Sequence, residues 1–341
     1  MKILISTGGT GGHIYPALII GKYLKENDID IFYTIGKRER EIEILKESNE
    51  KFINLPIGAP SDKLFYFQIF ISLFKSFSII KREKPDKVFA FGSYVSFPIL
   101  FISRLLKIPY YLHEQNSIPG KVIKTFSKKA EKVFISFCES KNYLDSNNIV
   151  ISGMPVREKI GKIDKDEAFK RFNLKDNKMT FLLFGGSGGS KFLLDLVKEF
   201  EDEFFKLNLQ GIVIKGNVEI NQEFKFDSVI LDYLNDIEYA YGASDFVISR
   251  GGASTIWEII YSKKPAIVIP IKNSEHQNKN CELIKNFNVG VIFKEDDKDS
   301  FPKILNEFIK NLDEYRKNFT EFSFPDTKSI ILKEILDDRK K

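Results

Sequence analysis

The sequence predicts an α/β protein of two Rossmann-like domains, each a doubly wound parallel sheet, that face each other across a cleft. Short apolar runs rich in β-branched and aromatic residues alternate with helical stretches, and this alternation restarts once in the second half of the chain. Glycine-rich turns of nearly the same spelling, Gly8–Gly12 and Gly185–Gly189, follow a predicted strand in each half. The length of 341 residues suits two such domains.

The N-terminal half begins with a predicted strand over Lys2–Ser6, the first glycine turn, and a helix over His13–Lys25. Apolar residues recur every three to four positions in this stretch, which is typical of a helix that packs one face on a sheet. Further strands of the same sheet are predicted over residues 29–35, 87–91, 109–113 and 132–136.

The second half repeats the pattern, with strands predicted over residues 180–184, 211–214, 228–231, 246–249 and 266–270. A charged segment that opens with Gly153, Met154 and Pro155 separates the two halves, which is typical of a domain connection. We therefore expect one domain over residues 1–155 and another over 156–325. A C-terminal helix within 326–341 is expected to pack back on the first domain.

Composition narrows the classes of partner and cofactor. The 52 basic and 47 acidic residues give a net charge of +5, which is too mild to predict nucleic-acid binding but compatible with attraction to an anionic membrane. Cys138 and Cys281 are the only cysteines, and they form neither a disulfide framework nor a zinc pattern. We expect no metal site and no cofactor.

The segment Lys63–Lys84 is unusually rich in phenylalanine and isoleucine. Its narrow polar stripe consists of Gln68, Ser72, Lys75 and Ser76. The run is too short to span a bilayer, and Lys75 interrupts it. Two interpretations stay open from the pattern: a helix that lies in the membrane interface, and a core helix of the N-terminal domain.

Polar residues that follow predicted strands are candidates for chemistry. His13 directly follows the first glycine turn, where the positive end of a helix favours the neutral imidazole that a general base requires; helix capping is the alternative. His113–Asn116 ends a predicted strand, where ligands bind in open α/β sheets. Either a sugar-binding loop or a structural hydrogen-bond network accounts for these four residues.

A third glycine turn, Gly251 and Gly252, precedes another predicted helix. Backbone amides at such a helix start can bind a diphosphate, and Glu258, one turn later, can accept hydrogen bonds from the two ribose hydroxyls. A carboxylate that only complements the helix dipole is the alternative for Glu258. The strand-end loop that contains His276 and Gln277 is suited to a sugar.

These motifs together resemble the MurG family of bacterial N-acetylglucosaminyltransferases, and they occur in the family's order over nearly the whole chain. The resemblance rests on Gly8–His13 with Pro16 and Ala17, Gly92–Ser96, His113–Asn116, Gly153–Arg157, Gly185–Gly189 and Gly251–Glu258. It implies a fold of the GT-B type and inverting transfer of GlcNAc from UDP-GlcNAc to the 4-hydroxyl of MurNAc in lipid I, undecaprenyl-diphospho-MurNAc-pentapeptide. The product is lipid II, a precursor of peptidoglycan.

The resemblance also implies what the reaction requires and where in the cell it takes place. UDP-GlcNAc is a substrate, no metal is obligatory, and the enzyme is peripheral on the cytoplasmic face of the plasma membrane. The interfacial interpretation of the phenylalanine-rich segment is therefore favoured. The membrane contacts it predicts are Phe67, Phe70, Phe74, Phe77 and Lys75.

The resemblance implies a role for individual residues of this chain, position by position. His13 is implied as the general base, with Glu114 as a second candidate. The implied substrate contacts are Thr10, Gly11 and Gly12 in the first turn, Asn116 on the donor sugar, Arg157, Ser187 and Gly188 on the donor nucleotide and phosphate, Leu234 on uracil, Ser254, Thr255 and Glu258 at the third turn and ribose, and His276 and Gln277 on the GlcNAc hydroxyls.

Two positions depart from the family's pattern. Ser93 stands where a glycine is usual before the tyrosine, and His276 stands where a glutamine can occur. The alternatives to the implied reaction are a UDP-sugar transferase that acts on another lipid such as diacylglycerol, a UDP-GlcNAc epimerase of the same fold, and a non-catalytic nucleotide-sugar-binding protein.

Overall fold

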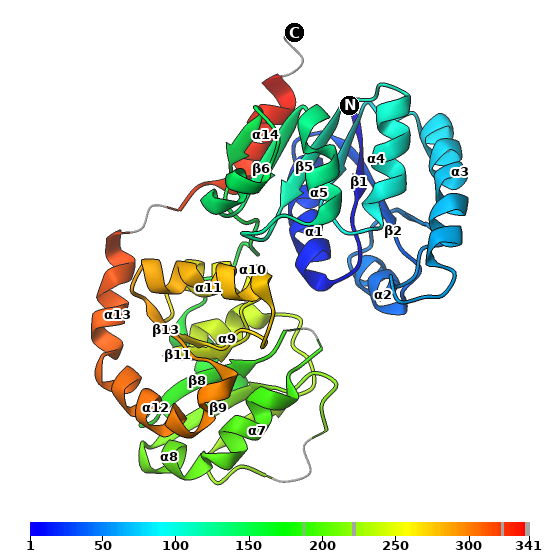
Figure 1. Cartoon of the computed structure of the whole chain (residues 1–341). Helices are drawn as coiled ribbons and strands as arrows, with labels where there is room; N and C mark the ends of the chain where they lie inside the picture. Colours follow the sequence, from blue (N-terminus) through cyan, green and yellow to red (C-terminus); the bar gives the residue numbers. More distant parts are fainter. Residues whose placement is uncertain (187, 220–222, 322–323, 338–341) are drawn as a thin grey trace. The chain divides into compact units, whose positions relative to one another are not determined.

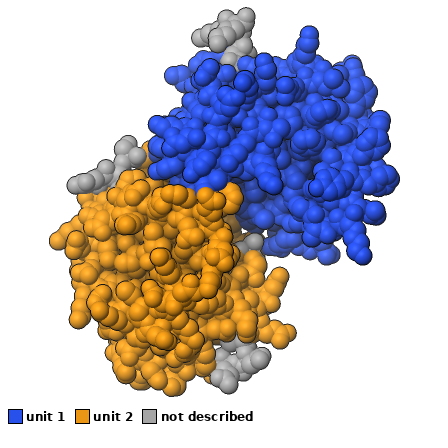
Figure 2. Space-filling model, viewed as in Figure 1, with its two compact units in different colours: residues 1–155, 325–341 blue, residues 156–324 orange. Residues whose placement is uncertain are grey.

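The structure is a computed structural model that describes residues 1–186, 188–219, 223–321 and 324–337. The chain divides into two compact units, drawn in different colours in Figure 2. Unit 1 comprises Met1–Pro155 and Pro325–Lys341, and unit 2 comprises Val156–Phe324. Each unit is an α/β sandwich around its own parallel sheet, so the predicted fold class is confirmed. The cleft between the domains stays a prediction.

The described part of unit 1 contains a parallel sheet of seven strands in the order β3-β2-β1-β4-β5-β6-β7. The strands are β1 (Lys2–Ser6), β2 (Asp30–Ile35), β3 (Phe52–Asn54), β4 (Lys87–Ala90), β5 (Tyr110–Glu114), β6 (Lys132–Ile135) and β7 (Ile149–Ile151). The helices and 3-10 turns are α1 (Gly11–Lys25), α2 (Glu39–Glu47), α3 (Phe65–Glu83), α4 (Ser96–Leu105), α5 (Lys121–Phe126), η1 (Ser127–Lys129), η2 (Cys138–Tyr143) and α14 (Thr327–Asp337).

Two apolar clusters cover the two faces of this sheet. Helices α1, α2 and α14 contribute buried side chains to one cluster, and α3, α4 and α5 contribute to the other (Figure 1). Because both faces are covered, the interior positions of the strands are mostly apolar, as expected for parallel strands, and many of the polar residues stand at the strand ends. The C-terminal helix α14 packs in unit 1 through Ile331 and Ile335, although the whole of unit 2 precedes it in the sequence.

The described part of unit 2 contains a parallel sheet of six strands in the order β10-β9-β8-β11-β12-β13. The strands are β8 (Met179–Phe184), β9 (Leu209–Ile214), β10 (Ser228–Leu231), β11 (Phe246–Ser249), β12 (Ala266–Val268) and β13 (Gly290–Ile292). The helices and 3-10 turns are α6 (Lys165–Phe172), α7 (Lys191–Glu199), α8 (Glu201–Lys206), α9 (Ile237–Ala243), α10 (Ala253–Ser262), α11 (Glu275–Asn286), η3 (Glu295–Ser300), α12 (Phe301–Lys310), α13 (Leu312–Asn318) and η4 (Phe319–Glu321).

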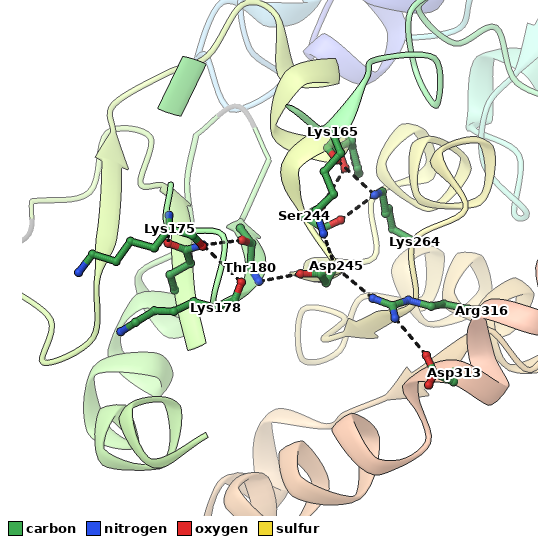
Figure 3. A network of polar contacts seen from close by, with 12 residues as sticks. Lys165, Lys175, Lys178, Thr180, Ser244, Asp245, Lys264, Asp313 and Arg316 are labelled. Atoms are coloured by element: carbon green, nitrogen blue, oxygen red, sulfur yellow. Dashed lines mark hydrogen bonds and ion pairs between the residues drawn. The ribbon is translucent and has the colours of Figure 1, made fainter. Parts of the chain in front are cut away.

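One carboxylate ties several elements together at the edge of the unit 2 sheet where the strands begin (Figure 3). Asp245, directly before β11, accepts a hydrogen bond of 2.8 Å from the Thr180 amide of β8. The same side chain pairs with Lys165 of α6 at 3.1 Å and with Arg316 of α13 at 3.2 Å. These contacts fix the beginnings of the central strands, whereas the glycine turns follow the strands' opposite ends.

Helix α1 packs closely against β2 at Gly21. A Cβ atom placed on Gly21 would lie 1.8 Å from Oη of Tyr33 and 3.1 Å from Cδ1 of Ile5. Tyr33 is fully buried, and its hydroxyl has no hydrogen-bond partner within the described ranges. The absence of a side chain at Gly21 therefore makes room for the tyrosine under the helix.

We expect Gly21→Ala to destabilise the protein by about 2 kcal/mol, because the added methyl overpacks the site, although alanine normally favours a helix interior. In a Tyr33→Phe background, which lacks the clashing oxygen, the same substitution is expected to cost less. Urea unfolding of the four proteins measures this. Equal costs in the two backgrounds would show that the Tyr33 hydroxyl does not set the packing.

Candidate active site

The first glycine turn connects β1 directly to α1. Gly8 has a φ of +149° and Gly9 a φ of +85°, which side-chain-bearing residues rarely adopt. A Cβ atom on Gly9 would also lie 2.7 Å from Oγ of Ser93. Thr10 then occupies the N-cap position of α1 without a capping hydrogen bond from its side chain, so the amides of Gly11 and Gly12 lie in the first turn of the helix, where no intrahelical acceptor exists for them.

A buried carboxylate from α2 holds this turn. Oε1 of Glu41 accepts a hydrogen bond of 2.8 Å from the Gly9 amide, and Oε2 accepts one of 2.7 Å from the Gly36 amide. Arg38 completes the contact by donating to the Gly9 carbonyl at 2.7 Å. Burial raises the pKa of Glu41, and the two amides and Arg38 partly offset this. The sequence analysis missed both residues, because α2 is highly charged and nothing in its pattern marks one carboxylate as buried.

His13 lies in the first turn of α1, half-buried beside Gly92. Its Nδ1 is 3.1 Å from Oγ1 of Thr10. Burial lowers the pKa of His13 to about 4, so the imidazole is neutral at pH 7. A neutral imidazole with one nitrogen held by a hydroxyl can accept a proton through the other.

The residues His113–Asn116 form a hydrogen-bond network at the end of β5. His113 is fully buried and stacks on Phe91, with 5.3 Å between ring centroids, and its Nδ1 is 3.0 Å from Nε2 of Gln115. Burial lowers the pKa of His113 to about 3. Of the four residues, only Asn116 is half-buried rather than buried.

Glu114 shapes the loop that follows β5. Its Oε1 accepts a hydrogen bond of 2.8 Å from the Asn116 amide, and its Oε2 accepts one of 2.9 Å from the Gly120 amide. Burial raises the pKa of Glu114 to about 7, although these amides favour the ionised form. Both carboxylate oxygens are thus used by the chain itself.

The second glycine turn lies after β8 and leads into α7. Gly186 and Gly189 have φ values of +91° and +77°, and a Cβ on Gly189 would lie only 2.0 Å from the Lys215 carbonyl oxygen. Gly188 is exposed, with open space around its Cα. Ser187, which the resemblance places on the donor, lies outside the described residues.

The third glycine turn lies after β11 and leads into α10. A Cβ on Gly251 would lie 2.4 Å from Sγ of Cys281, so no larger residue fits there. Oε1 of Gln277 accepts hydrogen bonds from the Gly251 amide at 3.2 Å and from the Ile271 amide at 2.9 Å. His276, its neighbour in α11, is exposed.

The first turn of α10 contains Ser254 and Thr255. The buried Oγ of Ser254 has no hydrogen-bond partner in the part of the chain that the structure describes. The helix start therefore offers a hydroxyl beside its amides, which suits an anionic ligand.

Arg250 joins the second and third turns. Its side chain is buried, donates from Nε to Oγ of Ser190 at 3.0 Å and from Nη1 to the Ile269 carbonyl at 3.1 Å, and pairs with Glu295. Ser190 caps α7 directly after the second turn. The sequence analysis gave Arg250 no role, because an arginine beside glycines gives no sign that it will be buried.

Glu258 lies in the second turn of α10, half-buried, and its Oε2 accepts a hydrogen bond of 3.2 Å from the Tyr241 hydroxyl. Arg157 donates to the Asn235 carbonyl and lies 3.5 Å from the Glu238 carboxylate. Leu234 precedes Asn235 in the loop between β10 and α9, so Arg157 holds the loop that carries the predicted uracil contact.

Helix α3 packs on the core through part of its apolar residues and exposes others. Phe67, Phe70, Phe74 and Phe77 are 59%, 56%, 66% and 42% exposed. Ser72 and Ser76, two members of the narrow polar stripe, are fully buried, so this part of the stripe faces the protein. The core-helix interpretation is therefore wrong for the four phenylalanines. No helix in the described ranges has the length and apolar character needed to cross a bilayer.

Helix α4 packs beside α3 (Figure 1) and also has exposed apolar residues. We call this set the apolar surface: Leu64, Tyr66, Phe67, Phe70, Ile71, Phe74, Phe77, Phe101 and Leu105. The same two helices and their flanks carry exposed cations, namely Lys63, Lys75, Lys81, Arg82, Lys84, Arg104 and Lys107. Within the described residues, no group of three or more His, Cys, Asp or Glu side chains could hold a metal ion.

We expect Glu41→Ala to destabilise the protein by about 3 kcal/mol, because the buried amide of Gly36 and the part-buried amide of Gly9 lose their acceptor. Hydrogen exchange at Gly9 and Gly36 should accelerate in this variant. Glu43→Ala, which removes an exposed carboxylate from the same helix, is the control and should change stability by less than about 0.5 kcal/mol. Unchanged exchange at Gly9 would mean that Glu41 does not hold the turn.

Comparison with known proteins identifies the domains. The glycosyltransferase family 28 N-terminal domain matches residues 3–135, and the glycosyltransferase family 28 C-terminal domain matches residues 180–329. Among solved structures, a MurG from Acinetobacter baumannii has a TM-score of 0.76 and 21% identity, and covers 98% of this chain and 99% of its own. A UDP-GlcNAc 2-epimerase from Neisseria meningitidis, bound to UDP-GlcNAc, has a TM-score of 0.69 and 17% identity, and covers 99% and 100%. These two structures show the shared fold.

Relatives of known name match over the whole length. A protein from Flavobacterium psychrophilum is 32% identical over 98% of this chain and 97% of its own length. One from a Sulfurihydrogenibium species is 35% identical over 99% of both chains. Both are named UDP-N-acetylglucosamine–N-acetylmuramyl-(pentapeptide) pyrophosphoryl-undecaprenol N-acetylglucosamine transferase. The resemblance in the motifs is thereby confirmed, and the chain belongs to this family of transferases, with both domains of glycosyltransferase family 28.

Proposed function

We propose that this protein transfers GlcNAc from UDP-GlcNAc to the 4-hydroxyl of MurNAc in lipid I, with inversion, and so forms lipid II for peptidoglycan. The observation that carries the proposal is the identity of 32% and 35% over nearly the whole chain with transferases named for this reaction. The geometry of the glycine turns supports it, because each turn presents helix-start amides of the kind that bind phosphate.

Unit 2 binds the donor in this proposal. The start of α10, with Gly251, Gly252, Ser254 and Thr255, takes the diphosphate, and the second turn with Ser187 and Gly188 adds further phosphate contacts. Glu258 accepts hydrogen bonds from the ribose hydroxyls. Leu234 reads uracil through its backbone, and Arg157 supports that loop through Asn235 and Glu238.

The GlcNAc moiety is assigned to His276 and Gln277 in unit 2 and to Asn116 in unit 1. Two backbone amides occupy Oε1 of Gln277, so its Nε2 is the atom that remains to donate to a sugar hydroxyl. Because the side-chain amide of Gln277 is fixed in this orientation, it presents an N–H group to the sugar ring and selects a hydrogen-bond acceptor at that position.

The general base is assigned to His13. With Nδ1–H donating to Oγ1 of Thr10, Nε2 carries the lone pair that removes the proton from the 4-hydroxyl. The oxygen attacks the anomeric carbon as the bond to the β-phosphate oxygen of UDP breaks, and helix-start amides stabilise the charge on UDP. We prefer His13 to Glu114 because both oxygens of Glu114 already accept backbone amides.

This single displacement uses no covalent enzyme intermediate. UDP-GlcNAc is a substrate, and we expect neither an obligatory metal nor an organic cofactor, as the family resemblance implies. The glycine-turn amides and the dipoles of α1 and α10 supply the positive potential for the diphosphates.

We further propose that the apolar surface lies on the anionic cytoplasmic face of the plasma membrane, where lipid I is held by its undecaprenyl chain. Each exposed phenylalanine contributes up to about 2 kcal/mol when buried among acyl chains. Each cation near anionic headgroups adds about 1 kcal/mol. Burial of Ser72 and Ser76 in place of the phenylalanines supports an external partner for the outer face of α3.

Radiolabelled UDP-GlcNAc, supplied with lipid I, with diacylglycerol or without acceptor, tests the proposed function. Chromatography should find the label in lipid II only when lipid I is present. Label in a glycosyldiacylglycerol would instead identify a transferase for another lipid. Epimerised sugar in the absence of acceptor would identify an epimerase, and either of these results would overturn the proposal.

We expect His13→Ala to lower kcat by at least about a hundredfold, because the 4-hydroxyl loses its base. UDP affinity, measured by calorimetry, should stay within about twofold, since the nucleotide contacts belong to unit 2. Turnover equal to that of the wild type would remove His13 from the catalytic role. A parallel loss of UDP binding would indicate a wider structural effect.

Substitution of Phe70, Phe74 and Phe77 by serine is expected to release the protein from vesicles that contain anionic lipid, with the melting temperature nearly unchanged because these side chains are exposed. Sedimentation with vesicles measures binding. Phe205→Ser, at a 61% exposed position in unit 2, is the matched control and should bind as the wild type does. Retained binding by the triple variant would contradict the membrane proposal.

A further inference from the structure

A buried tyrosine supports the carboxylate assigned to the ribose. Tyr241 of α9 is fully buried, and its ring meets that of Phe184 edge to face, with centroids 6.0 Å apart. Its hydroxyl donates to Oε2 of Glu258 at 3.2 Å. Burial and the neighbouring carboxylate raise the pKa of Tyr241 well above its ordinary value, so the phenol keeps its proton and can only donate to that carboxylate.

Glu258 has few other partners. Within the described ranges, the Tyr241 hydroxyl is the single hydrogen-bond donor to its carboxylate. The charged groups that act on it are Arg157, which favours the ionised form, and Glu238, which disfavours it. Burial is the largest influence and raises the pKa of Glu258, so the hydrogen bond from Tyr241 helps to keep the carboxylate ionised.

We propose that Tyr241 is a positioning residue for nucleotide recognition: its hydroxyl fixes the Glu258 carboxylate so that the remaining lone pairs face the 2′- and 3′-hydroxyls of the ribose. The inference rests on the proposed function, in which Glu258 binds these hydroxyls. A carboxylate can accept one hydrogen bond from each hydroxyl of a vicinal diol, and a side chain already held in the right orientation loses less conformational freedom on binding. The phenol of Tyr241, which lies in the protein interior, holds one carboxylate oxygen in place through its hydrogen bond.

The substitution Tyr241→Phe removes only the hydroxyl and keeps the ring against Phe184. Helix α9 also supplies a matched control, since Tyr239 donates to Oε1 of Glu167 at 2.9 Å at an exposed position. Tyr239→Phe therefore makes the same chemical change, loss of a phenol bonded to a glutamate, away from Glu258.

Calorimetry of the full chain with UDP and with 2′,3′-dideoxy-UDP tests the inference. The ratio of the two affinities measures diol recognition, and binding of the dideoxy compound reports that the nucleotide site is folded. We expect Tyr241→Phe to reduce the ratio about tenfold, the size expected for a hydrogen bond to a charged group. Affinity for dideoxy-UDP should stay unchanged, and Tyr239→Phe should keep the wild-type ratio.

The pH dependence adds a readout that loss of packing would not produce. Without the phenol, the pKa of Glu258 rises further, so a larger fraction of the carboxyl is protonated as pH falls. The loss of UDP affinity in Tyr241→Phe should therefore grow as the pH is lowered, because the raised pKa brings the carboxyl closer to protonation. A loss that does not change with pH and is shared by dideoxy-UDP would overturn the positioning role.

Glu258→Gln separates this inference from the proposed function. If Glu258→Gln abolishes the preference for UDP and Tyr241→Phe does not reduce it, the inference about Tyr241 fails and the ribose role of Glu258 stands. If Glu258→Gln keeps the preference for UDP over 2′,3′-dideoxy-UDP, both the ribose role of Glu258 and the inference about Tyr241 fail. The double variant should bind UDP no more weakly than Glu258→Gln alone, and additive losses would overturn the inference.

Discussion

In both units the chain must pass from a buried strand into a helix through a space that excludes a Cβ atom. At Gly189 the obstacle is the Lys215 carbonyl, at Gly251 it is Cys281, and at Gly9 it is the Ser93 hydroxyl. Such a turn brings the helix start close to the end of the strand, with its first amides unpaired. The proposed binding of phosphate by the chain depends on these amides.

Buried polar groups keep the turns in place. Glu41 bonds to the first turn, Arg250 joins the second and third, and Tyr241 orients Glu258 beside the third. Removing such groups from water is costly, and each is stabilised by hydrogen bonds to the backbone or to a charged neighbour. The proposed site consists mostly of backbone amides, and these buried polar side chains hold the turns and side chains that form it.

The sequence predicted the central strands and the turns, because parallel strands covered on both faces are continuous apolar runs and glycines mark sharp reversals. It missed β3, β7 and β13, which have three residues each and lie at sheet edges, where little burial shapes the sequence. It did not distinguish a binding loop from an internal network at His113–Asn116, because burial depends on tertiary packing. For α3, composition revealed the apolar character, but only the structure showed that serines face inward.

Ser93 has a φ of +66°, in the left-handed region that favours glycine, and this accounts for the glycine that is usual at this position, although not for the serine. The central claim is that uridine diphosphate lies at the carboxyl edge of the unit 2 sheet. A crystal structure of the protein with UDP-GlcNAc tests it most directly. We expect the diphosphate on the first amides of α10 and both ribose hydroxyls on Glu258. A nucleotide bound elsewhere, with the start of α10 empty, would contradict it.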